Sequence, residues 1–156
     1  MTSPATLPPP PSTAPAGAGR VRVALVGPSL DILGGQAVQL QRLLERLRAV
    51  DSLEMHFVPV NPRLPGPLRA MQRVKYVRTL VTETAYVASL LRRVPAFDVV
   101  HAFSASYSSF LLAPAPAVLA ARMFGRPSIV NYRSGEADDH LGRSPLARRL
   151  LASATE

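Results

Sequence analysis

Apolar residues follow two alternating patterns along the chain, which are short continuous runs and longer stretches with a period of three to four residues. The short runs are rich in valine and predict four strands, at Val21–Val26, Met55–Val60, Phe97–Phe103 and Pro127–Tyr132. The periodic stretches predict helices at Gln36–Val50, Pro67–Val94, Ala115–Phe124 and Leu146–Ala152. Strands alternating with helices predict an α/β fold, a Rossmann-like parallel sheet with flanking helices.

Single residues at the ends of these segments sharpen the prediction. Pro59 cannot donate to a sheet ladder, so the second strand should lie at or near an edge. Gly125 should end the third helix, and Ser144 should cap the last one. The near-continuous apolar character of Phe97–Phe103 is typical of a strand that is covered on both faces.

Composition divides the chain into a tail and one domain. Residues 1–19 consist of Pro, Ala, Ser, Thr and a few others without periodicity, and we predict a disordered Pro-rich tail there. Residues 20–156 should form one incomplete Rossmann-like domain. The chain has no cysteine, which excludes disulfides, thiolate catalysis and Cys-based zinc sites, and weakly favours a cytoplasmic location.

The charge balance is strongly basic, with 18 Lys and Arg against 10 Asp and Glu. This excess favours anionic partners such as nucleotide diphosphates or acidic lipid surfaces. Nucleic acid is not expected, because no RNA-binding strand pattern or zinc-finger spacing occurs. No apolar run reaches the ~18–20 residues of a membrane span. The arginines of Pro67–Val94 predict a solvated helix face, with peripheral contact to the inner face of a membrane as the alternative.

Ligands bind parallel sheets beyond the carboxyl ends of the strands. The predicted loops at that edge are Gly27–Gly35, Asn61–Gly66, Ser104–Ser109 and Arg133–His140. Gly34 and Gly35 stand where the first loop meets the helix that starts near Gln36. A glycine pair lets a ligand approach bare backbone at a helix N-terminus, where phosphates bind well. A plain flexible turn is the other interpretation of these glycines.

Arg133 and Glu136 directly follow the fourth strand. An arginine there could grip a phosphate or sugar hydroxyls, with Glu136 orienting it or contacting an acceptor. We expect this loop beside that of the first strand if the strand order is Rossmann-like. A polar loop before an acidic helix start is the other interpretation. A metal site formed by Glu136, Asp138, Asp139 and His140 is formally open but not favoured, so no metal or cofactor is expected.

His101 lies inside the third predicted strand. Its favoured role is structural, as a half-buried ring hydrogen-bonded to backbone, and the alternative is a wall of the ligand cleft. Several known motifs are missing from the chain. There is no G-x-G-x-x-G after the first strand, no P-loop and no G-x-S-x-G elbow, so a nicotinamide dehydrogenase, a P-loop enzyme and an α/β-hydrolase are not expected.

Three segments in order resemble the N-terminal, acceptor-side domain of GT-B glycosyltransferases of the family 4 type. Arg22–Gly35 resembles the family's first strand and Gly-Gly loop. Phe97–Ser104 resembles its D-V-V-H-x-H-S strand, and Arg126–Gly135 resembles its K-P-V-V-x-T-x-H-G strand and loop. Many members have a histidine where this chain has Arg133, so that role is not carried over. Arg133–Glu136 is instead similar to an Arg-Gly-Gly-Glu variant of the loop.

The resemblance implies transfer of a sugar from a nucleotide-sugar donor to a hydroxyl acceptor, which could be lipid-linked, a polysaccharide or a small molecule. It places phosphate at Gly34, Gly35 and Gln36, phosphate or donor sugar at Arg133, and acceptor at Glu136 and Ser104, with His101 nearby. The catalytic residue is unknown, with Arg133 as a candidate. The family's donor-binding domain has no counterpart in these residues, so the chain alone is expected to be inactive. A non-catalytic module that binds an anionic ligand and an inactive fragment are the alternatives.

Overall fold

A computed structural model describes residues 19–31, 34–63, 66, 75–104, 108–132 and 137–152. The predicted tail, apart from Gly19, lies outside these residues, and so do Arg133 and Glu136. The strands are β1 (Val21–Gly27), β2 (Leu53–Pro59), β3 (Val99–Ser104) and β4 (Ser128–Tyr132). The helices are α1 (Gly35–Arg48), α3 (Lys75–Arg93), the 3₁₀ helix η1 (Val94–Ala96), α4 (Ser108–Leu112), α5 (Pro114–Met123), α6 (Ala137–Arg143) and α7 (Pro145–Ala152).

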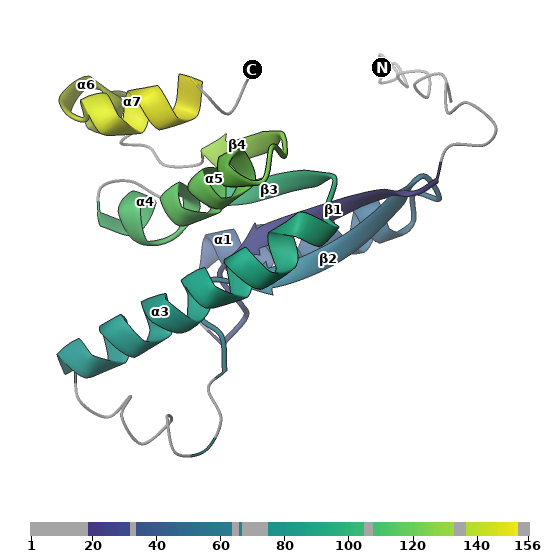
Figure 1. The fold of residues 1–156 in the computed structure, drawn as a ribbon, viewed down its shortest axis with the longest axis horizontal. Helices are drawn as coiled ribbons and strands as arrows, with labels where there is room; N and C mark the ends of the chain where they lie inside the picture. The colour runs from purple at the N-terminus through teal and green to yellow at the C-terminus, as the bar shows by residue number, and fades with distance from the viewer. Residues whose placement is uncertain are drawn as a thin grey trace, which may run out of the picture.

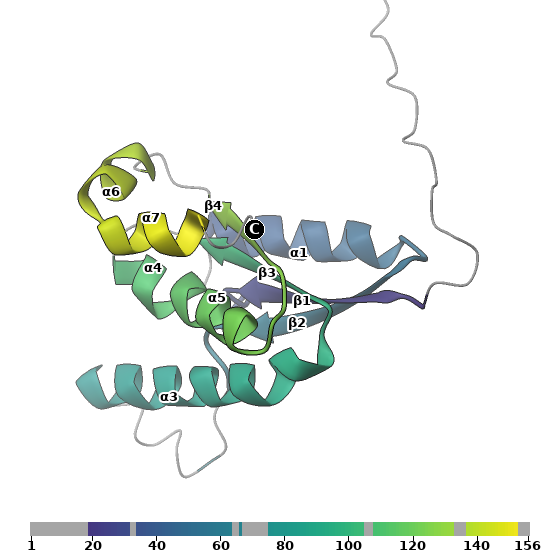
Figure 2. The same cartoon turned by 45° about the horizontal axis from the view of Figure 1, so that its top comes forward.

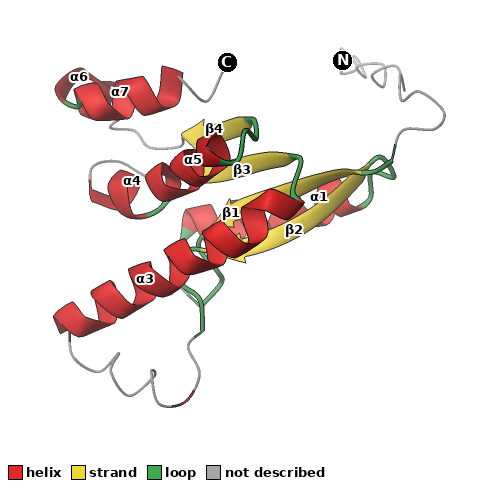
Figure 3. Cartoon of the chain, viewed as in Figure 1, coloured by secondary structure: helices red, strands yellow, loops and turns green. Residues whose placement is uncertain are grey.

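The four strands form one parallel sheet in the order β2-β1-β3-β4 (Figures 1 and 3). This arrangement confirms the predicted fold class, a Rossmann-like parallel sheet with flanking helices. The sheet edge at β2 also agrees with the prediction from Pro59, which pairs with Gly27 in the register of β1 and β2. Because all strands are parallel, their carboxyl ends share one edge of the sheet.

Helices cover both faces of the sheet. Figure 2 shows α1 on one side of β1 and β2, with α3 and α5 on the other. Successive side chains of β1 point to opposite faces of the sheet, so alternate residues of this strand contact different helices. Leu25 packs with Leu40 of α1, whereas Ala24 and Val26 pack with α3 and α5. The strand sequences are apolar on both faces for this reason.

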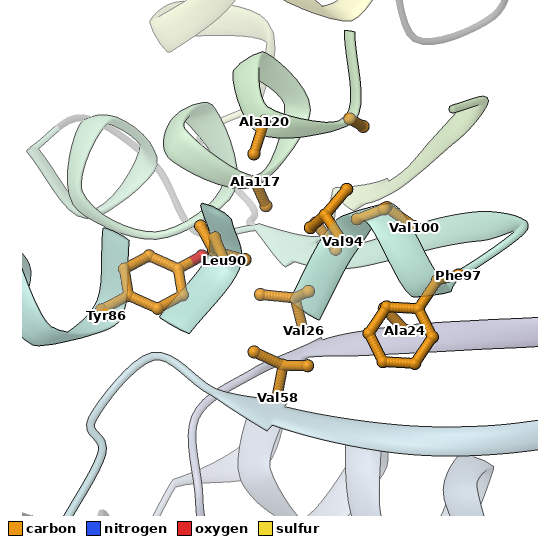
Figure 4. Packing of buried hydrophobic residues seen from close by; sticks show 12 residues of the cluster. Ala24, Val26, Val58, Tyr86, Leu90, Val94, Phe97, Val100, Ala117 and Ala120 are labelled. Carbon is orange, nitrogen blue, oxygen red and sulfur yellow. The ribbon is translucent and has the colours of Figure 1, made fainter. Parts of the chain in front are cut away.

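The largest part of the core lies between the sheet, α3 and α5 (Figure 4). Tyr86, Leu90 and Val94 of α3 and η1 are all fully buried there. Opposite them lie small residues of α5, which are Ala117, Ala120 and Ala121. Short side chains on α5 let this helix approach α3 and β3 closely, so the two helices share one apolar layer.

Helix ends follow the predicted capping residues. Gly125 has a positive φ of 62° after α5, and Gly125 N and Arg126 N donate to the carbonyls of Arg122 and Ala121 at 3.0 and 2.8 Å. This pair of bonds is a Schellman motif, in which glycine accepts the left-handed conformation at low cost. Ser144 caps α7, since its Oγ accepts a hydrogen bond of 3.2 Å from Ala147 N.

Several predicted boundaries were wrong. Phe97 and Pro127 precede β3 and β4 instead of belonging to them. Two short helices, α4 and α6, begin inside segments that were predicted to be loops. The long predicted helix is α3 from Lys75 onward, and its first part lies outside the described residues. Within the described part of the chain, no helix is long and apolar enough to cross a membrane.

Candidate functional site

The N-terminus of α1 opens at the carboxyl edge of the sheet, after the loop that leaves β1. Gly34 is the N-cap in an extended conformation, and its carbonyl accepts the first helical hydrogen bond from Val38 N at 3.3 Å. No acidic residue occupies the first turn. First-turn amides of a helix lack intrahelical acceptors, and the helix dipole makes this end positive. The predicted anion position is therefore a real helix start, within one residue of where the sequence placed it.

The space around each glycine distinguishes a glycine needed for packing from glycines that leave room for a ligand. A Cβ added to Gly34 or Gly35 would meet nothing within 4 Å, whereas a Cβ on Gly27 would lie 2.3 Å from Leu40 Cδ1 and 3.2 Å from Phe103 Cβ. Gly27 is thus needed for the close approach of α1 to the sheet. Packing in the described structure gives no reason for glycine at positions 34 and 35, and both positions leave room for a ligand against the backbone.

A polar clasp joins the loop after β1 to the loop after β2. Ser29 N donates to Asn61 Oδ1 at 3.0 Å, and Asn61 Nδ2 donates to Ser29 Oγ at 2.8 Å. The two residues are partly buried, so this reciprocal pair satisfies groups that would otherwise be costly to desolvate. The clasp fixes the path of the chain as it leaves β1 toward Gly34.

Arg63 and Asp31 of the same two loops form an ion pair. Arg63 donates to both carboxylate oxygens of Asp31, from Nε at 3.0 Å and from NH2 at 2.7 Å. The hydrogen bonds from Arg63 lower the pKa of Asp31, so this carboxylate stays ionised at neutral pH. The pair is exposed, and its electrostatic contribution to stability is small for that reason. Its geometric effect is to hold the Arg63 guanidinium against Asp31 of the loop Gly27–Gly35, which we call the glycine loop.

Gln36 ties the start of α1 to the end of β3. Its Nε2 donates to the Ser104 carbonyl at 2.8 Å. The Ser104 residue itself is fully buried. Two predicted site residues are therefore in direct contact, although the contact uses the backbone of Ser104 and the side chain of Gln36. This contact holds the helix N-terminus against the third strand.

His101 lies on the α1 side of β3, with its ring stacked on Phe103 at a centroid distance of 5.7 Å. The ring is partly buried, and burial lowers the pKa of His101, so the imidazole is neutral at pH 7. Its buried Nε2 has no hydrogen-bond partner among the described residues. The half-burial that the sequence predicted is confirmed, whereas the backbone hydrogen bond expected for the ring is missing at this nitrogen.

The loop of Arg133 and Glu136 lies outside the described residues, so its side chains cannot be placed. The strand before it is placed, and β3 lies between β1 and β4. A place for this loop beside the first strand's loop depended on a strand order in which β4 neighbours β1, and that condition is not met. Downstream, Asp139 of α6 pairs with Arg143 at 2.9 Å, one helical turn away.

Four residues were missed from sequence, Ser29 and Asn61 of the clasp and Asp31 and Arg63 of the ion pair. The signal for them was present, because polar residues directly after adjacent parallel strands meet at one sheet edge. No family model matches this chain, and no curated protein matches it significantly. What the described geometry offers chemically is an open helix N-terminus that Gln36 holds against β3, after a loop that the Ser29–Asn61 clasp joins to the end of β2.

Proposed function

We propose that this chain is the acceptor-side domain of a glycosyltransferase, which moves a sugar from a nucleotide-sugar donor to a hydroxyl acceptor. One observation carries the proposal, namely the open backbone of Gly34 and Gly35 at the positive end of α1. It stands at the carboxyl edge of a parallel sheet, where such sheets bind ligands. Support comes from the three sequence segments that resemble the family, because they fall on β1, β3 and β4 in order.

The proposed roles follow from position. The amides of Gly34 and Gly35 face a phosphate of donor or acceptor, and Gln36 holds the helix start against β3. Arg133 and Glu136 keep the roles that the resemblance implies, a phosphate or donor-sugar contact and an acceptor contact. His101 is neutral and lies under Phe103 on the same face of the sheet, so it serves as wall and not as a charged group.

Gly35→Val tests the phosphate site directly. A branched side chain at the helix start would fill the open space, and we expect affinity for a nucleoside diphosphate, measured by calorimetry, to fall at least tenfold. Stability should change little, because the added atoms meet no described neighbour. Gly19→Val is the matched control, since it makes the same change at another open position. Undiminished affinity in a folded Gly35→Val variant would remove the site.

Transfer itself needs a separate assay. The chain, extended by a fused nucleotide-sugar-binding domain, should be incubated with nucleotide-sugars and with lipid-linked and polysaccharide acceptors. Transfer that Gly35→Val abolishes would support the glycosyltransferase. Saturable binding of a nucleoside diphosphate by the present chain, without transfer by the extended one, would instead favour a non-catalytic anion-binding module.

We further propose peripheral contact of this domain with the inner face of a membrane. Three residues on one face of α3 are exposed although apolar, with Leu80 at 69%, Val87 at 37% and Leu91 at 41%. Their spacing of seven and four residues aligns them on the helix surface. Arg78 lies in the same helix, so apolar and basic groups occur together, as they do in helices that lie on acidic lipid surfaces.

Leu80→Glu should weaken vesicle binding. Burying a leucine is worth about 1.5–3 kcal/mol, so we expect at least a tenfold lower partition onto phosphatidylserine vesicles in co-sedimentation. Leu119→Glu is the control, because Leu119 on α5 is similarly exposed, at 53%. Equal losses in the two variants, or no binding by the unaltered chain, would contradict a membrane face on α3.

A further inference from the structure

An open pocket of about 450 Å³ lies at the end of the sheet opposite the glycine loop. It is bounded by the first residues of β1 and β2 and by the last turn of α3 with η1. Figure 2 shows α3 running along the face of the sheet opposite α1 and ending next to the start of β3. The length of β1, about 20 Å, separates this pocket from the candidate site.

Arginines from two distant parts of the sequence meet at this pocket. Arg22 comes from β1, and Arg92 and Arg93 come from the end of α3. Arg92 Nε donates to the Ala88 carbonyl at 3.2 Å, and Arg22 is held by Asp98, whose carboxylate accepts from Arg22 N at 2.8 Å. Arg93 has no ion-pair partner among the described residues. The guanidinium fork of arginine matches the oxygens of a phosphate.

The acidic group of the pocket is already engaged. Glu54 accepts a hydrogen bond from His56 Nε2 at 2.8 Å, two residues along β2. With three arginines against Glu54 and the neighbouring Asp98, the pocket keeps a net positive charge. Neutralisation of the negative end of the α3 dipole accounts for arginines in the last turn of that helix. Arg22 reaches the same pocket from β1, where its guanidinium pairs with Asp98, with 3.5 Å between Arg22 NH2 and Asp98 Oδ1.

Aromatic rings form the other part of the lining. Phe97 is buried, with 7% of its surface exposed, and its ring is tilted against the His56 ring at a centroid distance of 5.1 Å. Phe57 borders the pocket from β2, but its side chain packs with Leu25 and Leu40 on the other face of the sheet. Flat apolar surface beside a few well-placed charges is typical of small-molecule sites, whose volumes run from about 300 to 1,000 Å³. Such a lining suits a ligand with one aromatic ring and one phosphate.

We propose that this pocket binds a small molecule that carries an aromatic ring and a single phosphate, of the nucleoside monophosphate class. The phosphate meets Arg93 with Arg22 or Arg92, and the ring lies against the wall that includes His56 and Phe97. The site is separate from the glycine loop, and it holds whether or not the chain belongs to a glycosyltransferase.

Calorimetry of the full chain with AMP and UMP at physiological ionic strength tests the proposal. We expect saturable binding that Arg93→Ala weakens at least tenfold. Arg48→Ala is the matched control, because it removes the same charge from the exposed last turn of α1 and should leave affinity unchanged. No binding, or equal losses in the two variants, would overturn the proposal, the second result showing attraction to net charge alone.

Two further binding measurements test the chemical class of the ligand and the place where it binds. Inorganic phosphate and the free nucleosides should each bind at least tenfold more weakly than the monophosphate, and equal affinity for inorganic phosphate would overturn the assignment of an aromatic ligand. Gly35→Val should leave monophosphate binding intact. If Gly35→Val abolishes it while Arg93→Ala does not, the ligand lies at the glycine loop and the pocket is not its site.

Discussion

Replacing Tyr86 by alanine is expected to lower the free energy of unfolding by about 3–5 kcal/mol, as is usual for a buried aromatic side chain. Tyr86 is fully buried and is the largest such side chain between α3, α5 and the sheet (Figure 4). Its hydroxyl also donates to the Ala113 carbonyl at 2.6 Å, at the junction of α4 and α5. Tyr86→Ala would leave a cavity and remove the hydrogen bond that links α3 to the junction of α4 and α5.

Tyr86→Phe separates the hydrogen bond from the packing. We expect it to cost about 1–2 kcal/mol, because the ring stays and only the buried bond is lost. Val87→Ala, one residue along and exposed, is the control and should change stability little. Urea denaturation followed by circular dichroism measures all three variants. A loss for Tyr86→Ala no larger than that for Val87→Ala would mean that α3 is not packed as described.

The same hydroxyl predicts a pH dependence. Burial raises the pKa of Tyr86, so the folded protein keeps this proton at pH values where the unfolded chain, with a tyrosine pKa of about 10, releases it. The unfolded state then binds fewer protons, and stability falls as pH rises above about 10. The stabilisation is fully present below that pH. The alkaline fall should be shallower in Tyr86→Phe than in the unaltered chain.

The strands could be predicted from sequence because each carries a cluster of apolar, often β-branched residues. The apolar character is nearly continuous in β3, whereas Glu54 and His56 interrupt β2 at the sheet edge. The helix α4, with its sequence Ser108–Leu112, could not, since five residues are too few to show a period. Likewise, α6 contains two aspartates and a histidine and has no apolar stripe that a pattern would reveal. Short helices of this kind depend on tertiary contacts more than on local propensity.

The residues of the candidate site also fall into those that the sequence revealed and those that it did not. Gly34 and Gly35 were predictable, because a glycine pair between a strand and an amphipathic helix is a local signal. The Ser29–Asn61 and Asp31–Arg63 contacts were predictable only in part. Polar residues after β1 and β2 are visible in the sequence, but their pairing depends on which strand lies beside β1. Strand order also removes the basis for expecting the Arg133 loop beside that of β1, because β3 lies between β1 and β4. Apart from Pro59, which marks β2 as an edge strand, the order is set by packing over the whole domain and is not encoded in single segments.

Gly27→Val should be the second most damaging change, and it separates the structural glycine from the glycines of the proposed site. A Cβ at position 27 would overlap Leu40 Cδ1 and press on Phe103 Cβ, both in the buried layer under α1. Leu40 can shift only by disturbing its neighbours, and overpacking of this kind costs about 1–3 kcal/mol. Urea denaturation should show that loss for Gly27→Val, with Gly34→Ala and Gly35→Ala close to the unaltered chain.

The contrast also tests why glycines stand at the start of α1. If Gly34→Ala and Gly35→Ala destabilised the protein as much as Gly27→Val, folding alone would explain the pair, and the open backbone would lose its meaning as a ligand site. If they leave stability unchanged while Gly35→Val removes nucleoside diphosphate binding, the two glycines serve the ligand and not the fold. Gly27 then sets how closely α1 approaches the sheet, and that approach aims the helix N-terminus at the phosphate.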